Sequence, residues 1–378
     1  MQRLFTISFV SLLLLCGEAN ALETKAKNAI LVDYDTGQYL IAKEHQQPVP
    51  PASMSKLMTI YIIFSKLKDG SLSMEDTFPV SENAWRKGGA SSGGSTMFLN
   101  INSMVKIEDL LKGIIIQSGN DACIVAAENI AGSEEDFADL MNQTAKKIGL
   151  ENSNFVNSTG LPHPGHQMSV EDLAKLAKLI VSEFPEYYYM FSEKSFVYNK
   201  IVQGNRNPLL YAMPYADGLK TGHTEEAGFC LTASASRGNR RLILVMTGME
   251  SNKDRSEESE RMMSWGFREF DNYTILRKNA VIAKVPVWGG KKKEIELILA
   301  DDIIRTIPRS QANKVKMTAI YDKPVAAPIK KGDKLGVVKI SIPEENEFEV
   351  DLIAADNVEK LGLFGQIGLN IKYLLTGK

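Results

Sequence analysis

Three short motifs in this 378-residue chain carry residue types that together support nucleophilic catalysis by a serine. Residues 53–56 have the spacing S-x-x-K, residues 118–120 read S-x-N, and residues 220–222 read K-T-G. A serine hydroxyl becomes a useful nucleophile only when a neighbouring base takes its proton. A lysine is such a base when its amine is uncharged, a form that burial and a nearby cation favour. The motifs therefore predict acyl transfer through Ser53.

The S-x-x-K pattern alone is weak, because it occurs again at Ser65 and at Ser103. Ser53 differs because it follows two prolines at the start of a strongly apolar helix predicted over 57–68. One turn of that helix brings Lys56 onto the face of Ser53, and the positive end of the helix dipole favours an uncharged amine. Ser65 lies at the opposite helix end, and Ser103 fits a cap. The structural alternative for Ser53 is likewise an N-cap.

The other two motifs also have structural alternatives. Ser118-Gly119-Asn120 lies between helices predicted over 107–117 and 122–130, where glycine and asparagine are common turn and cap residues. Lys220 begins a predicted strand, where a lysine beside a glycine can protect a sheet edge. Only the three motifs together therefore predict a site.

The elements around the motifs predict an α+β fold. Residues 28–42 read as a hairpin, and 227–236 with 241–249 read as a second hairpin joined by 237–240. A mainly helical stretch separates the two hairpins, and an amphipathic helix is predicted over 254–270. We therefore expect residues 22–273 to form an antiparallel sheet packed with helices, plus a helical subdomain. After residue 273, short alternating segments between Pro and Gly turns predict a small all-β domain over 274–360.

The two ends of the chain differ from the rest. Residues 1–21 combine Arg3, an apolar run over 4–15 and the small-residue site at 19–21, so they predict a secretory signal peptide and an exported protein. Residues 361–378 carry an amphipathic helix that is too short to cross a bilayer. It can lie in a membrane surface, or equally pack on its own domain. Its apolar stripe consists of Leu363, Phe364, Ile367, Ile371, Leu374 and Leu375.

Composition excludes several function classes. The chain has 44 Lys+Arg against 46 Asp+Glu, which argues against nucleic-acid binding by global basic charge and against an acidic disordered protein. Cys16 lies in the predicted signal, and we expect Cys123 and Cys230 to be free rather than paired. His163 and His166 occur without an H-E-x-x-H pattern or cysteine ligands, which favours a loop role over a metal site. We therefore predict neither metal nor cofactor.

The three motifs in this order resemble those of the penicillin-recognising serine enzymes. Their extended forms are similar to those of one branch, the low-molecular-mass penicillin-binding proteins that are D-alanyl-D-alanine carboxypeptidases. The resemblance implies a catalytic domain like that of β-lactamases and transpeptidases, followed by a β-rich domain and a terminal helix. The segments that carry it are 51–59, 118–122, 218–224 and 264–267.

The resemblance implies a role for each motif residue. Ser53 attacks the carbonyl of the penultimate D-alanine of a peptidoglycan pentapeptide stem, with Lys56 as the proton acceptor. Ser118 relays the proton to the leaving amine, and Asn120 positions the substrate amide. Lys220 adds positive potential and helps to keep Lys56 uncharged.

The resemblance also implies how the substrate is held. Thr221, on the strand that includes Gly222, and Arg255 bind the terminal carboxylate, although the surroundings of Arg255 also suit a solvated helix start. Backbone N–H groups of Ser53 and His223 form an oxyanion hole, and 88–96 forms a flap over the site. β-Lactam antibiotics acylate the serine. The enzyme is periplasmic, and peripheral on the outer face of the inner membrane if the C-terminal helix contacts lipid.

Two rival functions stay open. A β-lactamase of the same superfamily shares the motifs, but no E-x-x-L-N segment supplies a deacylating water, and the second domain is surplus to that activity. A non-catalytic peptidoglycan-binding protein can share the fold, but the intact Ser53, Lys56 and Lys220 argue against it.

Overall fold

A five-stranded antiparallel sheet forms the centre of the first domain in the computed structural model, which describes residues 22–343 and 346–376. The predicted signal peptide over 1–21 lies outside the described residues. The strand order is β2-β1-β11-β10-β9, so both predicted hairpins are confirmed as neighbouring strands and β9 lies at an edge. The strands are β1 (Asn28–Asp33), β2 (Tyr39–Lys43), β9 (Ala216–Thr224), β10 (Gly228–Arg237) and β11 (Arg240–Met249).

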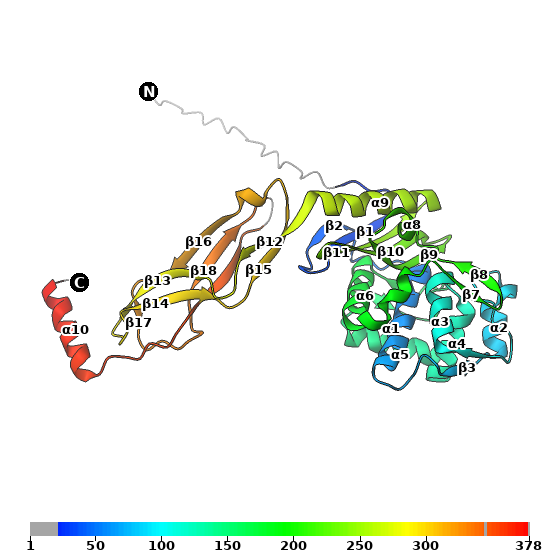
Figure 1. Cartoon of the computed structure of the whole chain (residues 1–378), viewed down its shortest axis with the longest axis horizontal. Coiled ribbons are helices and arrows are strands. Elements are labelled where there is room, and N and C mark those ends of the chain that lie inside the picture. Colours follow the sequence, from blue (N-terminus) through cyan, green and yellow to red (C-terminus); the bar gives the residue numbers. More distant parts are fainter. Residues whose placement is uncertain (1–21, 344–345, 377–378) are drawn as a thin grey trace, which may run out of the picture.

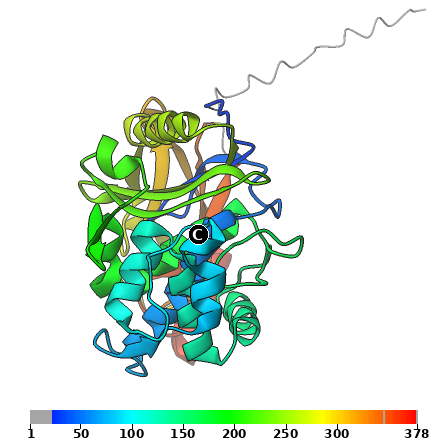
Figure 2. The same cartoon turned by 90° about the vertical axis from the view of Figure 1, so that its right-hand side faces the viewer.

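Helices cover both faces of this sheet (Figures 1 and 2). Alternate residues of β1 point to opposite faces, as the two-residue period of a strand requires. Ile30 packs into the core with helix α1, whereas Leu31 packs against Met262 and Phe267 of α9 (Asn252–Glu269). The central strands are therefore buried on both sides, which fixes their register.

The helical subdomain lies between β2 and β9 in sequence and surrounds α1 (Lys56–Lys68). Helix α1 is apolar on most sides because it runs through the middle of this bundle. The stretch predicted as one helix over 107–117 is α3 followed by a π-helical turn, Gly113–Gln117. The remaining helices are α2 (Glu82–Gly88), α3 (Ile107–Lys112), α4 (Asn120–Ala131), α5 (Glu134–Lys147), α6 (Val170–Glu183), α7 (Pro185–Tyr188) and α8 (Leu209–Ala212).

Three two-stranded antiparallel sheets and five short turns complete this domain and its neighbour. These sheets pair β3 (Thr77–Pro79) with β4 (Met104–Lys106), β5 (Ser153–Asn154) with β6 (Gln167–Met168), and β7 (Ser195–Tyr198) with β8 (Ile201–Gly204). The 3₁₀ turns are η1 (Ala52–Ser55), η2 (Ala90–Ser92), η4 (Tyr189–Ser192) and η5 (Ala312–Lys314), and η3 is the π-helical turn.

The second domain is all-β, as predicted, and has its own apolar core. Strand β12 follows α9 without a break and pairs with β15, and the other strands form one sheet of order β16-β18-β19-β14-β13-β17. The strands are β12 (Phe270–Leu276), β13 (Val281–Trp288), β14 (Glu294–Leu299), β15 (Ile303–Pro308), β16 (Lys316–Tyr321), β17 (Val325–Ala326), β18 (Lys334–Ser341) and β19 (Phe348–Ala354).

The C-terminal helix α10 (Leu363–Thr376) stands at the end of the β domain that is remote from the first domain (Figure 1). Its apolar stripe faces solvent, with Leu363 72% and Phe364 88% exposed. The alternative of a helix packed on its own domain is therefore wrong for this structure. Among the described residues, no helix has both the length and the apolar character needed to cross a membrane.

Candidate active site

Ser53 and Lys56 lie on the 3₁₀ turn η1 and at the first residue of α1. In a 3₁₀ turn the side chains at positions i and i+3 lie above one another, which suits the S-x-x-K spacing better than an α-helix does. Lys56 Nζ is 3.0 Å from Ser53 Oγ. Neither η1 nor α1 has a side-chain N-cap, so the N-cap alternative for Ser53 is wrong.

The Lys56 amine is fully buried and has two further partners. It donates to Asn120 Oδ1 at 2.8 Å and, through a very short bond, to the backbone carbonyl of Thr159. An uncharged amine has two N–H groups and one lone pair. The two carbonyl oxygens use both N–H groups, so the lone pair is left for the hydroxyl proton of Ser53. A proton can therefore move from Ser53 to Lys56 without loss of either other bond.

Electrostatics also favour the uncharged amine. Burial lowers the pKa of Lys56 to about 8, and the positive charge of Arg206 acts in the same direction. Burial, with Lys56 and Arg206 as nearby cations, holds the pKa of Lys220 well below its ordinary value. Three cationic groups in one poorly solvated site cannot all carry charge at low cost. Arg206 is thus an electrostatic contributor that the sequence analysis missed.

The S-x-N motif lies where the π-helical turn ends and α4 begins. Ser118 adopts the left-handed conformation with φ +64°, so the motif is a helix-joining turn and also lies at the site. Ser118 Oγ is buried and has no hydrogen-bond partner within the part of the chain that the structure describes. A buried hydroxyl without a partner is unusual and indicates a group poised for a missing ligand.

The K-T-G motif lies on the edge strand β9. Gly222 lets this strand approach the serine turn, because a Cβ there would lie 3.0 Å from Pro51 O and 3.2 Å from Ser53 N. Lys220 is 2% exposed and donates to Thr221 O at 3.0 Å. The alternative of an exposed lysine that protects a sheet edge is therefore wrong. The exposed ring of His223 lies 4.0 Å from that of Phe229.

Arg255 reaches the same site from α9. It is 7% exposed, and its guanidinium lies 5.5 Å from the centre of the Phe229 ring. Nη2 donates to Asn252 Oδ1 at 2.6 Å, whereas the buried Nε has no partner among the described residues. A buried guanidinium with spare donors is suited to a carboxylate. The alternative that Arg255 is a solvated residue at a helix start is therefore wrong, because its side chain is buried.

Two loops close the site. Asp121 holds the loop over 96–99, accepting from Thr96 Oγ1 at 2.6 Å and from Met97 N at 2.9 Å. In the adjoining stretch, Ser95 Oγ accepts a 2.7 Å hydrogen bond from Arg206 Nη1.

The second loop contains Gly160, which has φ +77°, and a Cβ there would clash with Ala52 O. This close contact brings the Thr159 carbonyl to Lys56.

A cavity of about 470 Å³ lies between these elements. A smaller cavity of about 360 Å³ adjoins it, and the two share four lining residues, Ser53, Ser95, Arg206 and His223. Of the residues predicted from the motifs, Lys56 and Lys220 are buried rather than lining either cavity, and Asn120 lines the smaller one. The larger cavity is lined by Ser53, Ser95, Ser118, Arg206, Thr221, Gly222, His223, Phe229, Asn252 and Arg255.

The competing residues have other bonds. Ser65 Oγ donates to Tyr61 O at 2.8 Å, and Ser103 Oγ donates to Asn100 O at 2.7 Å, so Ser103 closes a turn rather than capping a helix.

The two loop histidines are engaged with the backbone. His163 Nδ1 and His166 Nδ1 each accept a backbone N–H at 3.1 Å. No three His, Cys, Asp or Glu side chains of the described segments are grouped to hold a metal ion. Cys123 and Cys230 are buried and free.

Comparison with known proteins adds a family to this geometry. Residues 17–251 match the family model described as D-alanyl-D-alanine carboxypeptidase, and residues 270–360 match that of the C-terminal domain of penicillin-binding protein 5. The chain is 40% identical to D-alanyl-D-alanine carboxypeptidase DacC of Escherichia coli over 345 residues, 90% of this chain and 86% of that protein.

Two solved structures are also similar. Penicillin binding protein 5 from Haemophilus influenzae is 36% identical with a TM-score of 0.77, covering 89% of this chain and 98% of that one. D-alanyl-D-alanine carboxypeptidase DacD from Francisella tularensis is 30% identical with a TM-score of 0.80, covering 90% of this chain and 95% of that one.

Proposed function

Because the chain belongs to the D-alanyl-D-alanine carboxypeptidase family of penicillin-binding proteins, and is thus a serine-type peptidase, we propose that Ser53 is its nucleophile and Lys56 its general base. The observation that carries this assignment is the set of three partners around Lys56 Nζ: two carbonyl oxygens accept its N–H groups, which leaves the amine lone pair for the hydroxyl proton of Ser53. The substrate is a peptidoglycan stem that ends in D-Ala-D-Ala, and β-lactams acylate the same serine.

The proposed reaction has two steps. Ser53 Oγ bonds to the carbonyl carbon of the penultimate D-alanine while its proton passes to Lys56. The peptide C–N bond then breaks, and the leaving amine of the terminal D-alanine takes the proton through Ser118. Water then attacks the ester carbonyl, the bond between that carbon and Ser53 Oγ breaks as Oγ regains a proton from the water, and the shortened peptide leaves with a new carboxylate. The unpartnered hydroxyl of Ser118 and the contact of Asn120 with Lys56 support these roles.

The remaining motif residues are proposed to bind the substrate. Arg255 and Thr221 line the cavity beside Ser53 and supply donors for the terminal carboxylate. Lys220, buried on β9 itself, contributes positive potential. Backbone N–H groups of Ser53 and His223 are proposed as the oxyanion hole, since β9 is an edge strand and Gly222 lets it approach the serine.

The carboxylate role of Arg255 predicts a substrate-dependent loss. Arg255→Gln is expected to lower kcat/KM for a peptide ending in free D-Ala-D-Ala by about 10²-fold, the usual size of a lost charged contact. The same peptide with an amidated terminus is expected to be a poor substrate for the wild type and no worse for the variant. Stopped assays of released D-alanine, or D-alaninamide for the amidated peptide, measure both.

The matched control is Lys253→Gln, which removes an exposed cation from the same helix. It should leave both peptides unchanged. Equal losses on both peptides in Arg255→Gln would contradict a carboxylate contact. Failure to release D-alanine from the free peptide by the wild type would instead contradict the carboxypeptidase function.

The rival β-lactamase function lacks support at the cavity. Among the described residues that line the two cavities there is no carboxylate to activate a deacylating water. A long-lived penicilloyl ester on Ser53 is therefore expected, whereas turnover in well under a second would favour a β-lactamase.

We also propose where the enzyme works. Residues 1–21 direct export, residues 22–273 and 274–360 are the two domains, with a boundary that falls inside β12, and α10 rests in the outer face of the inner membrane from the periplasmic side. The exposed apolar stripe of α10, at the end remote from the catalytic domain, supports this placement. The helix would hold the β domain between the lipid and the active site.

Two acidic substitutions on the stripe are expected to remove membrane binding. Phe364→Glu with Leu374→Glu should weaken co-sedimentation with phosphatidylglycerol-containing vesicles at least about tenfold, since each buried apolar side chain contributes roughly 1.5–3 kcal/mol. The control Gln366→Glu with Asn370→Glu adds the same charge off the stripe and should retain binding. Equal loss in both double variants, or none in the first, would contradict an apolar contact. Turnover of a soluble peptide should not change.

A further inference from the structure

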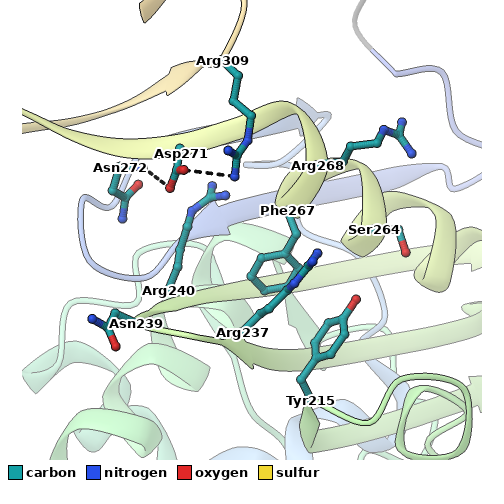
Figure 3. A pocket seen from close by; sticks show the side chains of 10 residues that line it. All are labelled: Tyr215, Arg237, Asn239, Arg240, Ser264, Phe267, Arg268, Asp271, Asn272 and Arg309. Carbon is teal, nitrogen blue, oxygen red and sulfur yellow. Dashed lines mark hydrogen bonds and ion pairs between the residues drawn. The ribbon is translucent and has the colours of Figure 1, made fainter.

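A large cavity lies away from the active site, at the junction of the two domains. It has a volume of about 780 Å³, which is the size range of small-molecule sites. Its residues come from the segment before β9, the β10–β11 turn, the C-terminal part of α9, the start of β12 and the residue after β15 (Figure 3). Helix α9 carries Arg255 near its other end, roughly 14–20 Å away at 1.5 Å per residue. The cavity is thus separate from the active site.

Guanidinium groups dominate this cavity. Four arginines line it, Arg237, Arg240, Arg268 and Arg309, against the single carboxylate of Asp271. Figure 3 shows Arg309 and Arg240 pointing toward one another from different domains. Like charges brought together in this way are unfavourable unless an anion lies between them.

Some of this charge is already compensated. Arg309 Nη2 pairs with Asp271 at 3.0 Å, and Arg268 Nε pairs with Glu269 at 2.7 Å, outside the cavity lining. Arg237 has its guanidinium 5.8 Å from the centre of the Tyr215 ring and no anionic partner among the described residues. At least one guanidinium thus remains free for a ligand.

Arg240 gives the clearest indication that a ligand is missing from this cavity. Its side chain is 9% exposed, and three of its bonds are structural: Nε to Asp33 at 2.7 Å, and Nη1 to Gly266 O at 3.0 Å and Phe270 O at 2.7 Å. Its Nη2 is buried with no hydrogen-bond partner in the described chain. Buried donors are almost always satisfied, so this nitrogen indicates a missing acceptor. An oxyanion supplies one, because the guanidinium fork matches carboxylate and phosphate oxygens.

The rest of the lining suits a larger ligand than a lone ion. The rings of Tyr215 and Phe267 meet edge to face at 5.5 Å and form an apolar wall. Asn239, Asn272 and Ser264 add neutral hydrogen-bonding groups around the rim. We propose that this junction cavity binds an oligoanionic small molecule, one that carries at least two phosphate or carboxylate groups, and that the ligand bridges the two domains through Arg237 and Arg309.

The test is isothermal titration of the purified full chain with inorganic pyrophosphate and, separately, with citrate. At least one anion is expected to bind one-to-one with a Kd below about 1 mM. Arg237→Gln with Arg309→Gln should weaken that binding at least about tenfold. Preference for pyrophosphate identifies a phosphate-bearing ligand, and preference for citrate identifies a polycarboxylate; both support the proposal.

The control is Arg86→Gln with Arg277→Gln, which removes two exposed arginines that do not line the cavity. It should bind the anion as the wild type does. Thermal unfolding without ligand verifies that both double variants are folded, and Arg237→Gln alone replaces the first if it is not. No binding of either anion up to about 10 mM, or equal weakening in the control, would overturn the proposal. Peptidase activity is not part of the readout, so failure here leaves the proposed catalytic function untouched.

Discussion

Replacement of Ser53 by alanine is expected to abolish both D-alanine release and covalent labelling by fluorescent penicillin. The variant has no oxygen to form the acyl bond, and Lys56 has no hydroxyl from which to take a proton. Loss of a nucleophile that acts with its base costs about 10⁴–10⁶-fold in kcat. The fold should be retained, because the Ser53 hydroxyl caps no helix.

The matched controls are Ser65→Ala and Ser103→Ala, the serines of the other two S-x-x-K patterns. Their hydroxyls donate to the backbone carbonyls of Tyr61 and Asn100, away from the cavity. Both controls should keep the label and the activity. A label that survives in Ser53→Ala, or is lost in either control, would show that the nucleophile has been misassigned.

Replacement of Lys56 by methionine is expected to lower the rate of acylation by about 10³–10⁴-fold. Methionine keeps a similar length and shape but has no base, and a positioned general base contributes about 10²–10⁴-fold. The substitution also leaves Asn120 Oδ1 and Thr159 O without their donor, so thermal unfolding should accompany the kinetics. Lys66→Met, on the same helix, is the control and should acylate normally. Normal acylation of Lys56→Met would exclude this lysine as the base.

The pH dependence of acylation provides a second readout of the same lysine. Burial lowers the pKa of Lys56 to about 8, and only the deprotonated amine can accept the proton. The rate constant should therefore rise with pH through about 8 and level off above it. This inflection should disappear in Lys56→Met, which a purely structural role would not explain.

Much of the fold follows from sequence because the local signals agree. In the two hairpins and in α9, the spacing of apolar residues along the sequence matches the spacing of the side chains that are buried. Leu31 and Met262, for example, pack together on the same side of the sheet. The run from Leu57 to Phe64 is apolar on all sides, and it became the central helix. Helix ends were less predictable, because the π-helical turn before Ser118 leaves no pattern distinct from an ordinary helix.

The site was predictable only in part. The motif residues are recognised by their mutual spacing, but Arg206 and the carbonyl of Thr159 have no such pattern. Arg206 reaches the cavity from the loop between β8 and α8, and Thr159 contributes a backbone atom that is independent of residue type. The junction cavity was also missed, since Arg309 and Arg240 are 69 positions apart in sequence and meet only through the domain arrangement.

The most direct test of the account is to locate the penicilloyl adduct on the chain by mass spectrometry. Cleavage after Lys and Arg places the three candidate serines on separate peptides, 44–56 for Ser53, 57–66 for Ser65 and 88–106 for Ser103. We predict one adduct per chain, on peptide 44–56, with fragment ions that assign it to Ser53 rather than to the buried Ser55. An adduct on either other peptide, or on Ser55, would contradict the account.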